Sequence, residues 1–237
     1  MEFANPPPWA LSAGYARHWE GLSSVRPPLD KSGKDTVVVI PHRLDSADRN
    51  EWLREAMESV AGWNTHVAVD RYRCGPASAI MHAERMIGAF PDYVFVLDDD
   101  DVALPEAIAK MRVALQASLA PFVCSDFIAE RDGVEVVDYR RVRYPTPETL
   151  VHGWGHRGLM GYYWPMVCRV GGLDTTLRRY YDYDIARRLA FTYGAPVYLP
   201  EKLLRYRLHG DQITKHARAN GTSPDELFRW LMSRPRE

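Results

Sequence analysis

Four consecutive carboxylates follow an apolar run near the middle of this chain, in the segment Val94-Phe-Val-Leu-Asp-Asp-Asp-Asp101. Like charges this close together repel and raise one another's pKa, so an ionised cluster usually holds a divalent cation or basic groups between its members. Oxygen ligands suit Mg²⁺ or Mn²⁺, and these cations commonly bridge a carboxylate to a diphosphate. The segment therefore predicts a metal site. The alternative is a solvated acidic turn that caps a helix starting near Pro105.

The apolar residues before the cluster predict a strand, and a strand would divide the carboxylates between its two sides. Asp98 and Asp100 would point to one side, and Asp99 and Asp101 to the other. Two carboxylates of one parity could then share one ligand.

The first half of the chain alternates between strand-like and helix-like patterns. The run from Thr36 to Ile40 is continuously β-branched, as in strands buried on both faces, and Pro41 is expected to end it. Alternating strands and helices predict a doubly wound α/β sheet, whose ligands sit outside the carboxyl ends of the strands. We expect strands at 36–40, 65–69, 93–97 and 122–124, and helices at 45–60, 76–89 and 105–118.

The second half is less regular. Asp132-Gly133 predicts a hairpin turn, Thr146-Pro147-Glu148 a short helix start, and residues 154–166 show no clear period. Further on we expect helices at 183–193 and 225–232 and strands at 196–199 and 203–207.

Composition describes a chain of 237 residues with a net charge of -1. Residues 1–118 carry 12 Lys/Arg and 17 Asp/Glu, and residues 119–237 carry 18 and 14, so the second half is the more basic. Cys74, Cys124 and Cys168 have no CxxC spacing, which excludes a disulfide framework or a typical zinc site and fits a reducing compartment. The sequence offers neither a signal segment nor a membrane span, so a cytoplasmic protein is expected.

From Thr36 to about Thr214 the chain resembles the family 2 glycosyltransferases of the GT-A fold. The resemblance rests on the order and spacing of several short segments. They are the first strand ending in Ile40-Pro41, the segment Tyr93–Asp101 with Pro105 after it, Val170-Gly-Gly-Leu-Asp174, Asp182-Tyr-Asp184 with Arg188, and Leu199–His209.

The fold this implies is a Rossmann-like, mostly parallel central sheet flanked by helices. The expected organisation is an N-terminal arm (1–34), a GT-A domain (35–214) with a nucleotide-sugar half (35–126) and an acceptor half (127–214), and a helical tail (215–237).

The resemblance also implies a nucleoside-diphosphate sugar donor, with Mn²⁺ or Mg²⁺ held on its diphosphate. Asp98 would lie near the ribose or nucleotide and Asp100 would bind the metal, with Asp99 and Asp101 as register alternatives. His209 would approach the metal or the diphosphate, and an imidazole ligand favours Mn²⁺ somewhat. Pro41, His42, Arg43 and Asp70 would line the nucleotide base. The plainer roles are a helix or turn cap for Asp70, surface positions for His42 and Arg43, and a structural role for His209.

Members of this type usually invert the sugar, which requires a carboxylate base across the sugar from the metal. Asp182 matches that position. The family's Glu-Asp pair here reads Tyr181-Asp182, and Asp184 is a second candidate. Asp182 could alternatively be the N-cap of the following helix.

The donor segment departs from the family pattern, because Asp70-Arg-Tyr-Arg-Cys-Gly75 replaces the usual Asp-Asp-Gly-Ser and Met81-His82 replaces Arg-Asn.

The default acceptor is a glycan or small molecule, with a hydroxylated base in DNA or a protein side chain as alternatives. Arginines and aromatics in 139–163 are the expected acceptor contacts. Two other functions compete with glycosyl transfer. One is a nucleotidyltransferase and the other is a non-catalytic binding module. A nucleotidyltransferase requires a Gly-rich phosphate loop after the first strand, and the segment found there, Pro41-His-Arg-Leu-Asp, contains no glycine.

Overall fold

The computed structural model describes residues 34–44, 47–88, 90–136, 159–210 and 212. Several predicted segments lie outside these residues. They are the N-terminal arm except for Lys34, the short helix near residue 146, the arginine-rich segment 139–144 and the C-terminal tail. Among the described residues, no helix is both long enough and apolar enough to cross a membrane.

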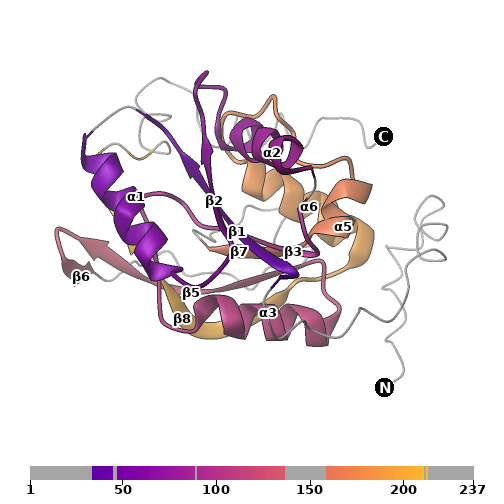
Figure 1. Ribbon diagram of the computed structural model, residues 1–237. Coiled ribbons are helices and arrows are strands. Elements are labelled where there is room, and N and C mark those ends of the chain that lie inside the picture. The colour runs from indigo at the N-terminus through magenta and orange to yellow at the C-terminus, as the bar shows by residue number, and fades with distance from the viewer. Residues whose placement is uncertain (1–33, 45–46, 89, 137–158, 211, 213–237) are drawn as a thin grey trace, which may run out of the picture.

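In the described part of the chain, eight strands form one mixed sheet in the order β2-β1-β3-β7-β5-β8-β4, with β6 paired to β5 (Figure 1). Strands β1, β2, β3, β5 and β8 run in one direction, and β4, β6 and β7 run in the other. The strands are β1 (Thr36–His42), β2 (Thr65–Val69), β3 (Tyr93–Val96), β4 (Val102–Ala103), β5 (Phe122–Arg131), β6 (Val134–Val136), β7 (Met160–Tyr163) and β8 (Val197–Arg207). The helices are α1 (Ala47–Ser59), α2 (Pro76–Ile87), α3 (Ala107–Ser118), α5 (Trp164–Arg169) and α6 (Tyr181–Tyr193).

Helices cover both faces of the sheet, which confirms the predicted α/β class (Figure 1). Successive residues of β1 show how the two cores form, because Val37 and Val39 pack with α2, α5 and α6, while Val38 and Ile40 pack with α1 and α3. A strand buried on both faces must be apolar at every position, and this is the pattern that Thr36–Ile40 carries.

Pro41 does not end β1, contrary to expectation, because the strand continues to His42. Val39 accepts a hydrogen bond from Leu97 on the β3 side, and His42 accepts one from Asp70 on the β2 side. Backbone groups alternate in direction along a strand, so Pro41 faces the β3 side, where the regular pairing ends at Val39. The missing N–H of proline therefore breaks no ladder bond there.

The second half is more regular than the sequence indicates. Asp132 and Gly133, both at positive φ, form the predicted hairpin turn between β5 and β6. The predicted strands at 196–199 and 203–207 are a single strand, β8, whose register against β5 shifts around Asp126. Strand β7 lies between β3 and β5, and a Cβ at Gly161 would come within 2.3 Å of the Phe95 ring, so the strand needs glycine there.

Candidate active site

The acidic segment is a tight turn at the carboxyl end of β3. Pairing with β1 continues to Leu97, whose N–H donates to Val39, and the chain then turns so that the Asp101 N–H donates to the Asp98 carbonyl at 3.1 Å. The chain is therefore no longer extended where the four aspartates stand. Asp98 and Asp100 lie together as expected, but the expected grouping of Asp99 with Asp101 is wrong.

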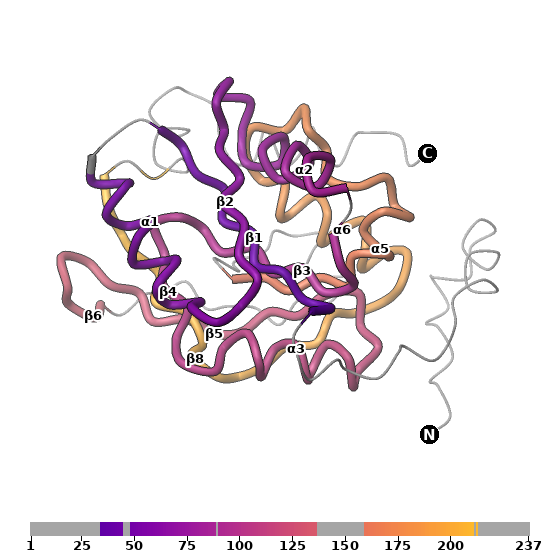
Figure 2. The backbone as a smooth tube through the Cα atoms, in the orientation of Figure 1, coloured from indigo at the N-terminus to yellow at the C-terminus, as the bar shows by residue number. Residues whose placement is uncertain are grey.

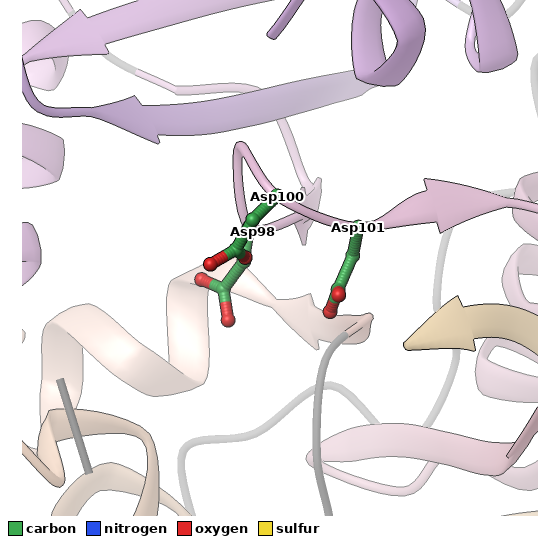
Figure 3. A group of neighbouring side chains, drawn as sticks. All are labelled: Asp98, Asp100 and Asp101. Carbon is green, nitrogen blue, oxygen red and sulfur yellow. The ribbon is translucent and has the colours of Figure 1, made fainter. Parts of the chain in front are cut away.

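The turn brings together Asp98, Asp100 and Asp101. Carboxylate oxygens of these three residues all lie within 4.8 Å of one another, and Figure 3 shows the side chains pointing to the same side of the loop. The Asp98 side chain makes no hydrogen bond or ion pair with any residue that the structure describes. One oxygen of Asp101 accepts a hydrogen bond from the Arg207 N–H at 3.0 Å, whereas its buried Oδ2 has no hydrogen-bond partner among the described residues.

Asp99 points away from this triad into a buried ion pair. Arg49 of α1 donates to Asp99 Oδ1 at 2.6 Å, and His42 Nδ1 lies 2.7 Å from Asp99 Oδ2. All three side chains are buried. Burial raises the pKa of Asp99, and the Arg49 guanidinium is the strongest influence in the opposite direction. The alternative that Asp99 takes part in the metal set therefore finds no support in this arrangement.

His209, just beyond the end of β8, contacts the same turn. Its Nε2 lies 2.8 Å from Asp100 Oδ2, and Arg49 also reaches Asp100 at 3.7 Å. The Trp52 ring lies 4.5 Å from the His209 ring, and the Arg207 guanidinium lies 5.3 Å from the Trp52 ring centre. An imidazole and three carboxylates thus stand at one edge of the sheet, held in place from α1 and β8.

Asp182 and Asp184 lie in the first turn of α6 in different environments. Asp184 is buried and accepts a hydrogen bond from Arg188 Nε at 2.9 Å, and Arg188 also donates to the Val170 carbonyl at 2.7 Å. Asp182 has no such side-chain partner among the described residues, and its negative charge acts on Asp98. The N-cap position belongs to Tyr180, so Asp182 is not the N-cap that the sequence left open.

Burial dominates the electrostatics of the site. It raises the pKa of Asp98 well above its usual value, and the neighbouring Asp100 and Asp182 charges add to this effect. Asp101 is shifted in the same direction by burial and then by Asp100. Burial also raises the pKa of Asp182, although backbone N–H groups donate to its carboxylate and oppose the change. A bound cation would stabilise the ionised form of these carboxylates, which burial and mutual repulsion disfavour in its absence.

The predicted nucleotide residues lie at the ends of β1 and β2. Pro41 and His42 are buried, and His42 Nε2 makes no hydrogen bond within the described part of the chain. Arg43 follows at a partly exposed position. Asp70 accepts hydrogen bonds from the N–H groups of Cys74 and Gly75, both at 2.8 Å, so its carboxylate has the capping role that was the alternative for it.

Arg49 and Trp52 are the site residues that the sequence did not reveal, and Arg207 was expected only as a neighbour of His209. They lie on α1 and β8, and only folding brings them to the acidic turn. Asp101 was considered only as a register alternative. The sequence does contain a signal for the position of Asp101. Pro105 indicates that the chain turns before the next helix, and in a turn the side chains no longer alternate between two sides as they do in a strand.

The residues present fit a divalent cation. Three carboxylates supply oxygen ligands of the kind that Mg²⁺ and Mn²⁺ prefer, and the Asp101 Oδ2 atom is buried without a hydrogen-bond partner among the described residues. His209 is close enough to Asp100 for both to face one ion.

The raised pKa values predict that the metal-free chain loses stability as the pH rises. The carboxyl groups of Asp98, Asp101 and Asp182 titrate near 3.8 in the unfolded chain and at higher pH in the folded chain. Between these values the folded state binds more protons, so the free energy of unfolding falls with increasing pH. In the presence of a chelator, we expect the melting temperature to fall as the pH rises from 5 to about 8.

Scanning calorimetry of the chain and of Asp98→Asn would measure this. The variant should show a shallower fall, and Mn²⁺ should reduce the fall in the parent chain. A melting temperature that rises over this range in both proteins would contradict the expectation.

Comparison with solved structures identifies the fold as that of GT-A glycosyltransferases. TarS residues 1–349 of S. aureus, solved with UDP-GlcNAc, match with a TM-score of 0.62 at 10% identity, over 83% of this chain and 64% of that one. The mannosyltransferase PcManGT of Pyrobaculum calidifontis, solved with GDP-Man and Mn²⁺, matches with a TM-score of 0.54 at 14% identity, over 91% and 73%. The chain thus spans under two thirds of the TarS fragment. No protein-family model matches the sequence, and comparison with curated proteins finds no relative.

Proposed function

We propose that this chain is a metal-dependent, inverting glycosyltransferase of the family 2 type that moves a sugar from a nucleoside diphosphate to an acceptor hydroxyl. The observation that carries the proposal is the triad of Asp98, Asp100 and Asp101 at the carboxyl end of β3, on a GT-A fold, with the Asp182 charge acting on Asp98. Ligands of open α/β sheets bind at such strand ends.

The donor diphosphate would be held through a divalent cation on Asp98, Asp100 and Asp101, with His209 beside Asp100. When bound, the cation neutralises charge on the diphosphate as it leaves. PcManGT was solved with GDP-Man and Mn²⁺, which supports Mn²⁺ as the first ion to test. The choice between Mn²⁺ and Mg²⁺ is otherwise open, because both accept these ligands.

The nucleotide would lie over the ends of β1 and β2. His42 offers to a base a buried Nε2 that has no hydrogen-bond partner among the described residues, and Arg43 follows on the same strand end. Asp70 would shape this end indirectly, because its carboxylate holds the loop that leads into α2. This refines the expectation that Asp70 contacts the base itself.

Asp182 would take the proton from the acceptor hydroxyl as that oxygen attacks the anomeric carbon. A carboxylate whose pKa is raised by burial is a stronger base than a solvated one, which suits this role near neutral pH. Asp184 is engaged by Arg188 and would instead fix the start of α6. The acceptor half of the domain, 127–214, contains both residues.

Thermal melting with nucleotide sugars tests the donor assignment directly. The full chain is mixed with UDP-, GDP-, CDP- and dTDP-sugars, with Mn²⁺, with Mg²⁺ or with a chelator. At least one donor should raise the melting temperature only when the metal is present, and slow release of its free sugar should follow. Binding without any turnover would instead favour the non-catalytic module, and no shift with any donor would contradict the proposal.

A further inference from the structure

Two exposed loops carry a concentration of arginines to which the proposed donor site assigns no contact. The loop between β2 and α2 presents Arg71, Tyr72 and Arg73, and Tyr72 is 86% exposed. The segment leading into α6 presents Arg178, which is exposed, and Arg179, which is partly exposed. We call these five residues the arginine ridge.

Direct packing holds the two loops together. A Cβ placed on Gly75 would lie 2.7 Å from the Arg178 Cα, so the backbones approach as closely as glycine allows. Gly75 also has a φ of 102°, which favours glycine independently. Figure 2 shows the loop after β2 beside the orange segment that precedes α6.

Each loop is also fixed from within. The Asp70 carboxylate accepts the N–H groups of Cys74 and Gly75, which closes the first loop around Tyr72. In the second, Leu173 and Leu177 are buried in the core, and Asp174 accepts hydrogen bonds from Thr176. The arginine ridge is therefore a set of long side chains on a rigid base.

The guanidinium groups of the arginine ridge are available for a ligand. Arg71, Arg73, Arg178 and Arg179 form no ion pair or hydrogen bond through their side chains with any residue that the structure describes. The Asp70 carboxylate in the first loop is already engaged, since it caps that loop through the Cys74 and Gly75 N–H groups. Four arginines without carboxylate partners make a surface that favours phosphates.

The exposure of the arginine ridge indicates a large ligand. Small-molecule sites are concave and bury most of the ligand, whereas Tyr72 and its neighbours project into solvent. An exposed aromatic ring between two arginines matches the way proteins hold single-stranded nucleic acid, with arginines on phosphates and a base stacked on the ring.

We propose that the arginine ridge binds single-stranded nucleic acid as the acceptor of the transfer. The proposal rests on the proposed function, because it takes Asp182 as the base. Arg178 and Arg179 lie in the segment that leads directly into α6, whose first turn carries Asp182. A strand lying on the ridge would then place a hydroxylated nucleotide beside the base that activates it.

Fluorescence anisotropy of the full chain with a labelled single-stranded oligonucleotide, at increasing salt, tests the proposal. Affinity should fall linearly on a log-log plot, and each arginine that neutralises a phosphate contributes about 0.7 to the slope. Arg71→Ala/Arg73→Ala and Arg178→Ala/Arg179→Ala should each reduce the slope by about 1.4. The matched control, Arg54→Ala/Lys202→Ala, removes two exposed charges from α1 and β8 and should keep the parental slope.

Tyr72→Ala distinguishes nucleic acid from a polyanion of another kind. It should weaken oligonucleotide binding by roughly five- to a hundredfold while leaving binding of inorganic polyphosphate unchanged. Equal effects on both probes would overturn the assignment to nucleic acid. Two results would contradict nucleic-acid binding by the arginine ridge. One is the absence of oligonucleotide binding at low salt, and the other is a parental salt slope in either double arginine variant. Oligonucleotide binding needs no donor, so these results are independent of the melting test of the proposed function.

Discussion

Replacing Asp182 by Asn is expected to lower the rate of sugar transfer by roughly two to four orders of magnitude, the usual contribution of a positioned general base. Asn has nearly the same shape and keeps acceptor capacity for the backbone N–H groups at the start of α6, so the fold should be retained. Donor affinity should be nearly unchanged, because Asp182 is assigned to the acceptor proton and not to the diphosphate.

The measurement is the initial rate of transfer at saturating donor, together with the metal-dependent melting shift that the donor causes. Since burial raises the pKa of Asp182, the acidic limb of the pH-rate profile should lie above the ordinary range of an aspartate. In Asp182→Asn this limb should disappear from whatever activity is left.

Asp184→Asn is the matched control two residues along the same helix. It removes the carboxylate charge that Arg188 contacts at 2.7 Å, so it should lower the melting temperature and retain transfer per folded molecule. Full activity in Asp182→Asn combined with loss in Asp184→Asn would assign the base to Asp184.

Asp100→Ala is expected to abolish divalent-dependent donor binding. Asp100 contacts His209, is partly exposed like Asp98, and belongs to the set whose oxygens lie within 4.8 Å of one another. Loss of groups that only support metal ligands usually costs ten- to a hundredfold in affinity, so the loss of a ligand should cost about a hundredfold or more.

Titration calorimetry with Mn²⁺ and the donor measures this loss, and far-UV circular dichroism checks the fold. Removal of a repelling charge should raise the melting temperature of the metal-free variant, because Asp100 raises the pKa of Asp98 and Asp101. Asp48→Ala, which removes an exposed carboxylate from the first turn of α1, serves as the charge control. Unchanged Mn²⁺-dependent binding in Asp100→Ala would remove Asp100 from the metal site.

The sequence alone predicted the order of the longer strands and helices up to Ser118 and the place of the acidic cluster. The run Thr36–Ile40 and the alternation up to Ser118 predicted a sheet covered on both faces, and the structure confirms this class. Such features are readable because side-chain periodicity and turn residues are local properties of the chain. The hairpin at Asp132-Gly133 is confirmed for the same reason.

The tertiary structure decided which carboxylates act together. The turn at Asp98–Asp101 brings Asp101 beside Asp98 and Asp100, whereas Asp99 binds Arg49 across 50 positions of sequence. Arg207 and His209 reach the same turn from more than 100 positions away. The close approach of Gly75 to Arg178, which builds the arginine ridge, is equally remote in sequence. Contacts of this kind depend on how the sheet closes, and no local spacing of residue types encodes them.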